Sequence, residues 1–375
     1  MKKIITVVGA RPQIIKAAAF SRAVKKLGEG MLQEILVHSG QHYDEGMSQV
    51  FFNEMGIPAP AHNLAVGSGS HAVQTARIMQ GLEHVFTEEK PAAVLVYGDT
   101  NTTLAAALVA SKMFIPVVHV EAGLRSFNKR MPEEINRIAT DHVSTLLFAP
   151  TQTAIDNLKR EGFHAETSHT PTIDQPLVLR SGDVMYDNAI YFSNRAEGDA
   201  YLLELGLVKD GYAVATIHRD NNTDFPDRLN GILDALKQWS AQHSMPVVLP
   251  THPRLLKFLS ETQQADLRNA GLRLVPPASY VQMIALLAAS RLVFTDSGGL
   301  QKEAYFVQRP CVILRPETEW VELTTGGHAI VADSSTERIL QAAQQLMERN
   351  FETWPQLYGD GRAAEQICQS IIQFL

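Results

Sequence analysis

With 375 residues, 45% of them hydrophobic and 19% charged, the chain has the composition of a compact globular protein and, at about 150 residues per domain, room for two domains. Its formal net charge of −7 argues against nucleic acid as a partner, because phosphate binding along a whole chain needs a basic face. The two cysteines, Cys311 and Cys368, lack disulfide or metal-ligand spacing, and no apolar run approaches the roughly 18–20 residues of a membrane span. A cytoplasmic protein without a metal site or a membrane partner is therefore expected.

The first half of the sequence alternates short β-branched runs with longer amphipathic stretches, which is typical of βα units on a parallel sheet. Strands are predicted at residues 4–8, 34–38, 93–97, 117–120 and 146–149. Helices are predicted at residues 14–27, 45–55, 72–86, 102–113, 133–144 and 153–161. The near-continuous hydrophobicity of the strands indicates burial on both faces of the sheet.

This alternation stops at residues 164–180, where prolines, histidines and hydroxyl side chains gather, and we place a domain boundary there. A second series of strands is predicted at 213–217, 247–250, 272–275, 292–295 and 311–314. The sequence thus predicts an α/β protein with two Rossmann-like domains, at 1–175 and 176–354. The closing segment, 355–375, contains a predicted helix. The sequence alone does not decide whether this helix packs on the first domain or on the second. Open α/β sheets bind ligands at the carboxyl ends of their strands, so a cleft between the domains is the expected site of chemistry.

The first strand runs directly into GARPQIIK at residues 9–16, a glycine turn that leads into a helix and carries two cations, Arg11 and Lys16. Amides at a helix N-terminus with nearby cations suit a phosphate group. A plain strand-to-helix turn with surface cations is the alternative. Because the motif is not G-x-G-x-x-G, no nicotinamide cofactor is expected.

Carboxylates follow two further apolar strands of the first domain. Asp99 lies in the polar run GDTNTT, which follows the strand at 93–97, and Glu121 ends the strand at 117–120. Helix capping explains Asp99 equally well, but a carboxylate such as Glu121 at the end of a buried strand is costly without a purpose. The next helix begins MPEEINR, with Glu133 and Glu134 beside its positive end. Asp99, Glu121 and one of these two glutamates form a candidate acid–base cluster.

In the second domain, His218 and Arg219 follow the first strand and precede a polar run. They offer an imidazole and a cation to a ligand, and a structural histidine is the alternative. The motif THPR at 251–254 is a weaker candidate of the same kind.

The fourth strand of the second domain leads into DSGGLQKE at residues 296–303. Ser297, Gly298 and Gly299 offer a hydroxyl group and closely approachable backbone amides to a diphosphate. Glu303, further along the helix, offers acceptors for ribose hydroxyls. A Gly-Gly loop before a helix is the alternative explanation.

Taken in order, the motifs GARPQIIK, SGQHYD, YGDTNTTLAAAL, HVEAGLRSF, MPEEINR, TDH, GDVMYD, TIHR and TDSGGLQKEA resemble the non-hydrolysing UDP-N-acetylglucosamine 2-epimerase family, from the first strand to about residue 333. The resemblance implies two Rossmann-like domains of the glycosyltransferase-B type facing across a cleft, a homodimer, and no need for metal or nicotinamide. It implies a UDP-sugar substrate whose C2 is inverted by elimination and re-addition of UDP, to supply precursors of bacterial surface polysaccharides.

The resemblance also implies roles for the candidate residues. The implied catalytic set is Asp99, Glu121, Glu133 and His218. The set that binds UDP, with Arg219 added from its place beside His218, is Arg11, Lys16, Arg219, Ser297, Gly298, Gly299 and Glu303.

Some positions depart from the commoner family pattern. Gln13 and Lys302 stand where Glu is usual, and Asn221 falls where the His-Arg motif normally continues with Glu-Asn. Residues 164–178 are longer and more polar than the usual link, and nothing in the sequence explains them.

The segments RSFNKRMPEE and TEWVE are more similar to the family branch that epimerises UDP-2,3-diacetamido-2,3-dideoxyglucuronate than to the UDP-N-acetylglucosamine branch, where TEWVE usually reads Thr-Glu-Arg-Pro-Glu. A carboxylate on the substrate needs a cation, and the sequence leaves five sources open: Arg125, Lys129, Arg130, Arg254 and Arg315. A glycosyltransferase with the same architecture, which transfers sugar to an acceptor, is the alternative enzyme. A UDP-sugar sensor without turnover is the alternative outside enzymes.

Overall fold

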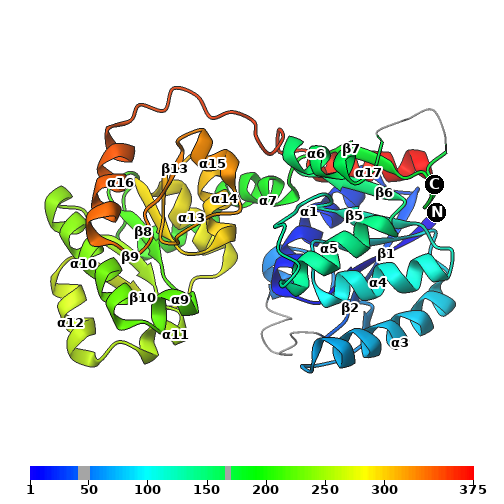
Figure 1. The fold of residues 1–375 in the computed structure, drawn as a ribbon, viewed down its shortest axis with the longest axis horizontal. Helices are drawn as coiled ribbons and strands as arrows, with labels where there is room; N and C mark the ends of the chain where they lie inside the picture. Colours follow the sequence, from blue (N-terminus) through cyan, green and yellow to red (C-terminus); the bar gives the residue numbers. More distant parts are fainter. Residues whose placement is uncertain (41–50, 165–169) are drawn as a thin grey trace. The chain divides into compact units, whose positions relative to one another are not determined.

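The computed structural model describes residues 1–40, 51–164 and 170–375 (Figure 1), and these divide into two compact units. The first unit comprises Met1–Asn188 and Gln356–Leu375, and the second comprises Ala189–Pro355. The sequence placed the boundary at residue 175, whereas residues 176–188 lie in the first unit, because strand β7 (Leu177–Arg180) pairs with the last predicted strand of the first sheet.

Among the described residues, the first unit has a parallel sheet of seven strands in the order β3-β2-β1-β4-β5-β6-β7. Its other strands are β1 (Lys2–Val8), β2 (Leu32–His38), β3 (His62–Asn63), β4 (Ala93–Tyr97), β5 (Val117–Val120) and β6 (Leu146–Ala149). The five strands predicted here are present, and β3 and β7 were not predicted. β3 has only two residues, and β7 lies in the proline-rich stretch where the pattern breaks.

Helices cover both faces of this sheet. They are α1 (Arg11–Leu27), α3 (His71–Glu89), α4 (Asn101–Lys112), α5 (Pro132–His142), α6 (Gln152–Arg160) and α17 (Ala363–Phe374), while α7 (Val184–Ser193) crosses into the second unit. The predicted helix at 45–55 lies partly outside the described residues, and residues 51–55 are helical. Ile5 and Val7 of β1 pack in one core with Ile78 of α3.

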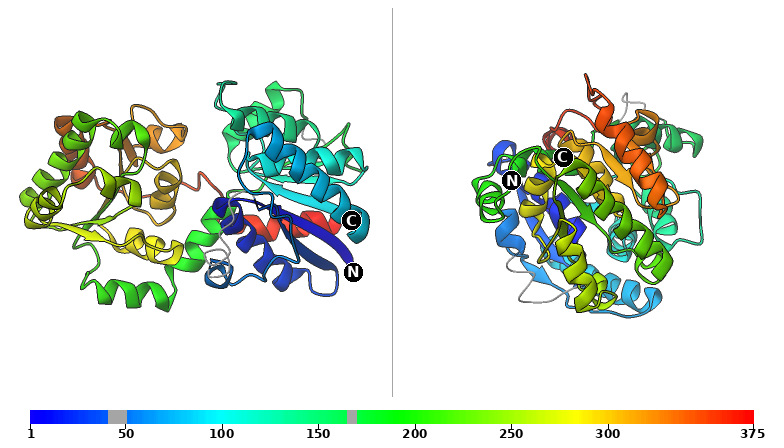
Figure 2. Two further views of the ribbon diagram at one scale, coloured as in Figure 1. Left: turned by 90° about the horizontal axis from the view of Figure 1, so that it is seen from below. Right: turned by 90° about the vertical axis from the view of Figure 1, so that its left-hand side faces the viewer.

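The closing helix α17 packs against α1 in the first unit (Figure 2). Lys26 and Glu365 form an ion pair of 2.5 Å between these two helices. The Asp187 carboxylate accepts hydrogen bonds from the backbone amides of Ala363 and Ala364, at 3.1 and 2.7 Å, and so holds the start of α17. The last residues of the chain therefore complete the first unit.

The second unit has a six-stranded parallel sheet in the order β10-β9-β8-β11-β12-β13. The strands are β8 (Ala213–Thr216), β9 (Val247–Pro250), β10 (Leu272–Val275), β11 (Leu292–Thr295), β12 (Cys311–Ile313) and β13 (Ala329–Val331). The helices are α8 (Ala196–Glu204), α9 (Asp220–Thr223), α10 (Pro226–His243), α11 (Pro253–Lys257), α12 (Glu261–Asn269), α13 (Tyr280–Ala289), α14 (Gly298–Phe306), α15 (Val321–Thr325) and α16 (Thr336–Glu348). β13, with three residues, was not predicted.

In both sheets the strand order reverses beside the first strand, between β1 and β4 and between β8 and β11. Open α/β sheets bind ligands at the carboxyl ends of the strands at such a switch point. The predicted motifs follow β1, β4, β5, β8 and β11 and thus lie at these two edges. The prediction of two Rossmann-like domains with parallel sheets is confirmed. Within the described part of the chain, no helix combines the length and apolar character that crossing a membrane requires.

Candidate active site

Glu121 follows β5 in a backbone conformation that residues with side chains rarely adopt, with φ at +76°. Such a conformation persists where the surroundings hold it and is often found at functional sites. The Glu121 amide donates to the Phe148 carbonyl at 3.0 Å. Its carboxylate forms an ion pair with Lys16 of α1, and the two side chains are only 11% and 13% exposed. The structure thus brings together two of the residues selected from the sequence.

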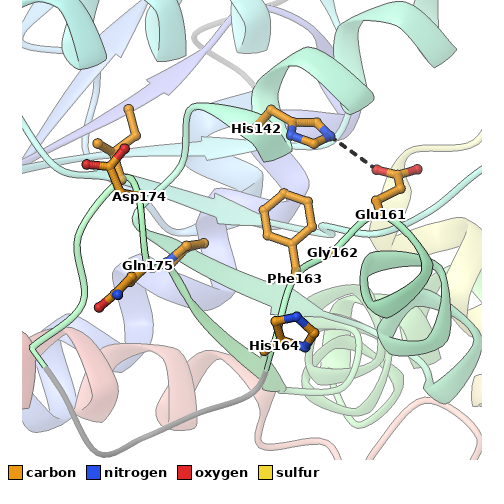
Figure 3. A pocket seen from close by; sticks show the side chains of 9 residues that line it. His142, Glu161, Gly162, Phe163, His164, Asp174 and Gln175 are labelled. Atoms are coloured by element: carbon orange, nitrogen blue, oxygen red, sulfur yellow. Dashed lines mark ion pairs between the residues drawn. The ribbon is translucent and has the colours of Figure 1, made fainter.

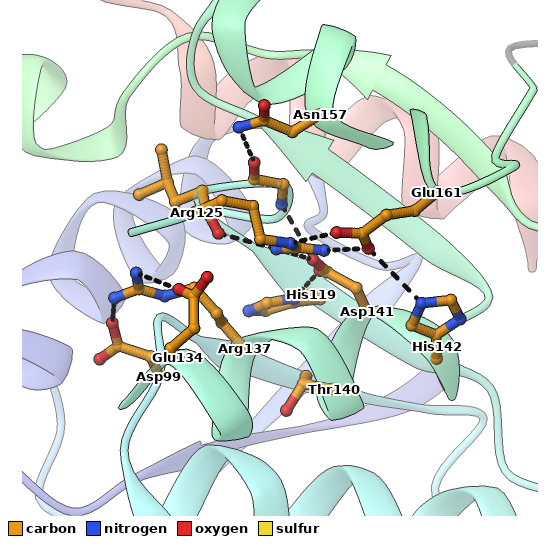
Figure 4. Close-up of polar contacts among 12 residues, drawn as sticks. Asp99, His119, Arg125, Glu134, Arg137, Thr140, Asp141, His142, Asn157 and Glu161 are labelled. Carbon is orange, nitrogen blue, oxygen red and sulfur yellow. Dashed lines mark hydrogen bonds and ion pairs between the residues drawn. The ribbon is translucent and has the colours of Figure 1, made fainter. Parts of the chain in front are cut away.

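Asp99, directly after β4, forms an ion pair with Arg137 of α5 (Figure 4). The neighbouring Asn136 side chain donates to the backbone carbonyl of Asp99 at 2.8 Å. Arg137 also pairs with Glu134, one turn earlier, at 3.0 Å. The Asp99 turn is therefore held on α5 by both a side-chain and a backbone contact.

The two glutamates at the start of α5 have different environments. Glu133 is exposed, whereas Glu134 is buried and accepts hydrogen bonds from the amides of Ser126 and Phe127, both at 2.9 Å. Burial acts to raise the pKa of Glu134, but these amides and Arg137 outweigh it and lower the pKa overall. Glu134 is thus an ionised group that holds the loop at 126–131, and Glu133 is the exposed member of the pair.

A buried histidine–aspartate pair joins the turns that carry Asp99 and Glu121 (Figure 4). His119 Nδ1 lies 2.6 Å from the Asp141 carboxylate, and His119 Nε2 lies 2.8 Å from the Gly98 carbonyl. Asp141 also accepts the amide of Gly123 at 3.1 Å. Burial acts to raise the pKa of Asp141, but His119 and Arg125 outweigh it and lower the pKa. The His119 ring thus lies between a carboxylate of α5 and the backbone carbonyl of the residue before Asp99.

Arg125 extends this network to α6 and its end. The guanidinium is 1% exposed and lies 2.7 Å from Asp141 and, through two nitrogens, 2.7 Å from each oxygen of Glu161. A bidentate pair of this kind fixes both partners in one geometry. Asn157 of α6 donates to the Gly123 carbonyl at 3.0 Å. The backbone around Glu121 is thereby held from both sides.

Gln13, one of the departures from the common pattern, has a structural role. Its carbonyl oxygen accepts the amides of Gly9 and Ala10 at 2.9 and 3.1 Å, and its amide group donates to the Tyr97 carbonyl and the Thr103 hydroxyl at 3.0 and 2.9 Å. An amide suits this position because it accepts and donates at once. Arg11, two residues earlier, is exposed, and its guanidinium lies 4.7 Å from the centre of the Phe51 ring.

In the second unit, His218 is oriented by Asp296, which follows β11. His218 Nδ1 lies 3.0 Å from the fully buried Asp296 carboxylate, which also accepts the backbone amides of His218 and Arg219 at 3.0 and 2.9 Å. Burial acts to raise the pKa of Asp296, but His218 and these amides outweigh it and lower the pKa. With Nδ1 directed to Asp296, His218 Nε2 is left to meet a ligand. Asn222, rather than Asn221, completes the arrangement by donating to Asp296 at 3.2 Å.

The residues Ser297, Gly298 and Gly299 form the start of α14, with Ser297 as its N-cap. The Trp320 indole donates to the Gly298 carbonyl at 2.9 Å, which fixes the segment after β12 beside this helix start. A Cβ at Gly298 would lie 2.3 Å from the Glu319 carboxylate, which pairs with Arg315 at 2.9 Å. The backbone amides here can approach an anion because side chains are missing.

Lys302 and Trp320, two positions at which the sequence departs from the common family pattern, are in contact near this helix start. The Lys302 ammonium lies 4.1 Å from the centre of the Trp320 ring, a cation–π arrangement. Both Lys302 and Glu303 are buried in α14.

Sequence reasoning missed His119, Arg137, Asp141 and Asp296, which hold the selected residues in place. His119 and Asp296 could have been found by the criterion that identified Glu121. Each is a polar side chain inside a buried strand or directly after one. Arg137 and Asp141 are helical positions whose partners depend on how α5 packs, and their sequence carries no such signal. Among the described residues, no group of three or more His, Cys, Asp or Glu side chains is placed to hold a metal ion.

A cavity of about 350 Å³ lies elsewhere in the first unit (Figure 3). Its lining is His142, Glu161, Gly162, Phe163, His164, Ile173, Asp174, Gln175 and Pro176. None of the site residues selected from the sequence lines it. The cavity is linked to the site through Glu161, whose carboxylate lies 3.5 Å from His142 and also binds Arg125.

These two Rossmann-like units, one with a set of paired carboxylates and the other with a glycine-rich helix start, define a protein of the glycosyltransferase-B class of fold. The family model described as UDP-N-acetylglucosamine 2-epimerase matches residues 25–372, and the chain belongs to that family.

Similar proteins cover nearly the whole chain. The UDP-2,3-diacetamido-2,3-dideoxy-D-glucuronate 2-epimerase of Pseudomonas aeruginosa is 45% identical over 372 residues, 98% of each chain. The structure of the Methanocaldococcus jannaschii UDP-GlcNAc 2-epimerase in complex with UDP-GlcNAc and UDP matches with a TM-score of 0.81, 35% identity and 99% of each chain covered. The UDP-GlcNAc 2-epimerase of Neisseria meningitidis bound to UDP-GlcNAc matches with a TM-score of 0.81 and 26% identity, over 99% of this chain and 100% of the other.

Proposed function

We propose that this chain is a non-hydrolysing 2-epimerase that inverts C2 of UDP-2,3-diacetamido-2,3-dideoxyglucuronate. The observation that carries the proposal is the Glu121 carboxylate, held on a strained backbone against Lys16. The 45% identity to the epimerase of this uronate exceeds the 36% identity to the UDP-N-acetylglucosamine 2-epimerase of M. jannaschii, which supports the choice of substrate.

The proposed reaction is elimination followed by re-addition. A base removes the proton from C2, the C1–O bond breaks, and UDP leaves with the bonding electron pair, which gives a 2-acetamidoglucal-type alkene. UDP then adds back to C1 while an acid delivers a proton to the opposite face of C2. The scheme needs carboxylates near C2 and positive or donor groups around the departing diphosphate.

The first unit supplies the proton-transfer groups in this proposal. Asp99, Glu121 and Glu133 move the C2 proton, and the assignment of base and acid among them stays open. Asp99 has the Arg137 guanidinium beside it, and Glu121 has the Lys16 ammonium beside it.

UDP is held by the remaining candidate residues. Arg11 and Lys16 bind phosphate oxygens from the first unit. In the second unit, the proposed phosphate-binding groups are His218 Nε2, Arg219 and the helix start at Ser297, Gly298 and Gly299, and Glu303 binds the ribose. The support for His218 is the orientation of its ring by Asp296.

We further propose that the enzyme is a cytoplasmic homodimer that supplies precursors of bacterial surface polysaccharides. A glycosyltransferase and a silent UDP-sugar sensor are not favoured, because the family match spans both units and the first unit concentrates paired carboxylates at one sheet edge.

Parallel incubations with UDP-N-acetylglucosamine and the UDP-diacetamido-uronate, followed by proton NMR of the H1–H2 coupling, test the proposal. The expected result is a new C2 epimer from the uronate, with little from UDP-N-acetylglucosamine. Failure of the uronate to epimerise, or net sugar transfer to an added acceptor, would overturn it.

A further inference from the structure

We propose that Arg130, assisted by Lys129, binds the C6 carboxylate of the substrate and thereby selects a uronate over a neutral hexosamine. This inference rests on the proposed function, because it places the sugar ring at the carboxylates of the first unit. In a six-membered ring the carboxylate on C5 lies within one ring's width of C2. The cation that binds it must therefore stand near Asp99 and Glu121.

Most cations of the first unit at this edge already have carboxylate partners. Arg125 is buried between Asp141 and Glu161 and cannot turn to a ligand without giving up both of these ion pairs. Arg137 is shared by Asp99 and Glu134, and Lys16 pairs with Glu121.

The two candidate cations in the second unit, Arg254 and Arg315, also have carboxylate partners. The Arg254 guanidinium lies 2.6 Å from both oxygens of Asp224. Arg315 pairs with Glu319, 2.9 Å away, beside the helix start proposed for the diphosphate. Of the five cations that the sequence offered, Lys129 and Arg130 are the two that the structure leaves exposed without a carboxylate partner among the described residues.

The loop that carries them, residues 126–131, has a fixed and unusual shape. The Glu134 carboxylate accepts the first two amides of the loop, and the Asn128 side chain accepts the Arg130 amide at 3.1 Å. Phe127 has a positive φ of +56° and is 74% exposed. A strained backbone that presents an aromatic ring and two cations to solvent is a feature expected of a binding loop.

This loop is connected to the proposed chemistry through two residues. Glu134, which holds the loop, pairs with Arg137, and Arg137 pairs with Asp99. The loop and the Asp99 turn therefore keep a defined spacing, which a specificity contact on the same sugar requires.

Arginine suits the role better than lysine, because its planar fork binds both oxygens of a carboxylate. A charge-assisted pair of this kind changes affinity by about 10- to 100-fold. The sugar of UDP-N-acetylglucosamine is uncharged and offers no carboxylate to Arg130, so the affinity for this nucleotide sugar does not depend on the contact.

The test compares Arg130→Gln with the unaltered protein in two assays: binding of the UDP-diacetamido-uronate and of UDP by calorimetry, and epimerisation of the uronate by NMR. The expected result is a 10- to 100-fold weaker binding of the uronate, a matching rise in KM, and a UDP affinity within twofold of the original. The affinity of Arg130→Lys for the uronate should lie between those of Arg130→Gln and the unaltered protein. Lys129→Gln should lose less uronate affinity than Arg130→Gln. Arg77→Gln, an exposed arginine of α3 with the same charge change, should leave all these values unchanged.

Unchanged uronate binding in Arg130→Gln, or an equal loss for UDP and the uronate, would overturn the inference. If the unaltered protein binds both ligands but makes no epimer, the proposed function fails, and the ratio of the two affinities still decides the role of Arg130.

Discussion

The two sheet edges hold their charges in different ways. In the first unit, carboxylates and cations form a connected set, in which Arg137 joins Asp99 to Glu134 and Arg125 joins Asp141 to Glu161. In the second unit, the buried Asp296 is satisfied by backbone amides and His218, next to a glycine-rich helix start. Proton transfer requires carboxylates at defined positions, whereas a diphosphate needs donors that approach closely. In the proposed function, proton transfer takes place at the first edge, and most of the groups that bind UDP lie at the second.

The largest expected effect is that of Glu121→Gln. Removing a proton-transfer group should lower kcat by about 10²- to 10⁴-fold. The affinity for UDP should change far less, because, among the described residues, Lys16 is the one proposed UDP-binding residue that loses an ion-pair partner in this variant. Progress curves by NMR and UDP titration by calorimetry measure the two values. A kcat within fivefold of the original would remove Glu121 from the chemistry.

Asp141→Asn tests whether buried ion pairs hold the first edge. His119 and Arg125 would lose their shared anion inside the protein, which should lower the free energy of unfolding by about 3 kcal/mol. Urea unfolding at neutral pH measures the change. The control is Asp234→Asn, which removes an exposed partner of Lys237 and should cost less than about 1 kcal/mol. Similar losses in the two variants would contradict this account of the edge.

Gly298→Ala tests the second edge. The new methyl group would lie against the Glu319 carboxylate and narrow the approach to the helix start, so UDP binding should weaken about tenfold, or roughly 1.4 kcal/mol. At saturating substrate kcat should stay nearly unchanged. Adding Glu319→Ala should restore part of the affinity if that contact is responsible. Full UDP affinity in Gly298→Ala would show that the diphosphate lies elsewhere.

His38→Asn should have the smallest effect, with little cost at neutral pH. Burial lowers the pKa of His38 to about 4, while its Nδ1 accepts the Gly40 amide at 2.9 Å. Because the unfolded chain binds the proton at the ordinary pKa near 6.5, stability falls as pH drops from about 6.5 to 4, by up to about 1.4 kcal/mol per pH unit. Asparagine keeps an acceptor and removes the titration, so urea unfolding at several pH values should show a flatter slope. An unaltered dependence of the free energy of unfolding on pH would mean that groups other than His38 determine it.

The sequence predicted the strands that are long and buried, because an apolar run of four or more residues is a strong local signal. β3 and β13 were not predicted because they have only two and three residues, and β7 was not predicted because it follows prolines. Glu121 was found from its place after a buried strand. Arg137 and Asp141 could not be found, since their partners Asp99 and His119 lie more than 20 residues earlier in the sequence and meet them only in the folded protein. The residues alone left the choice between Glu133 and Glu134 open, because the two face different surroundings only in the folded helix. It was the family resemblance that implied Glu133.

Solvent exchange at C2 tests the central claim most directly. The UDP-diacetamido-uronate is incubated with the protein in deuterated water, and both epimers are recovered and examined by proton NMR and mass spectrometry. Removal and return of the C2 proton by carboxylates of the first unit predicts deuterium at C2 in the product and, as the reaction reverses, in the substrate. Full retention of the original hydrogen in an epimerised product would contradict elimination and re-addition.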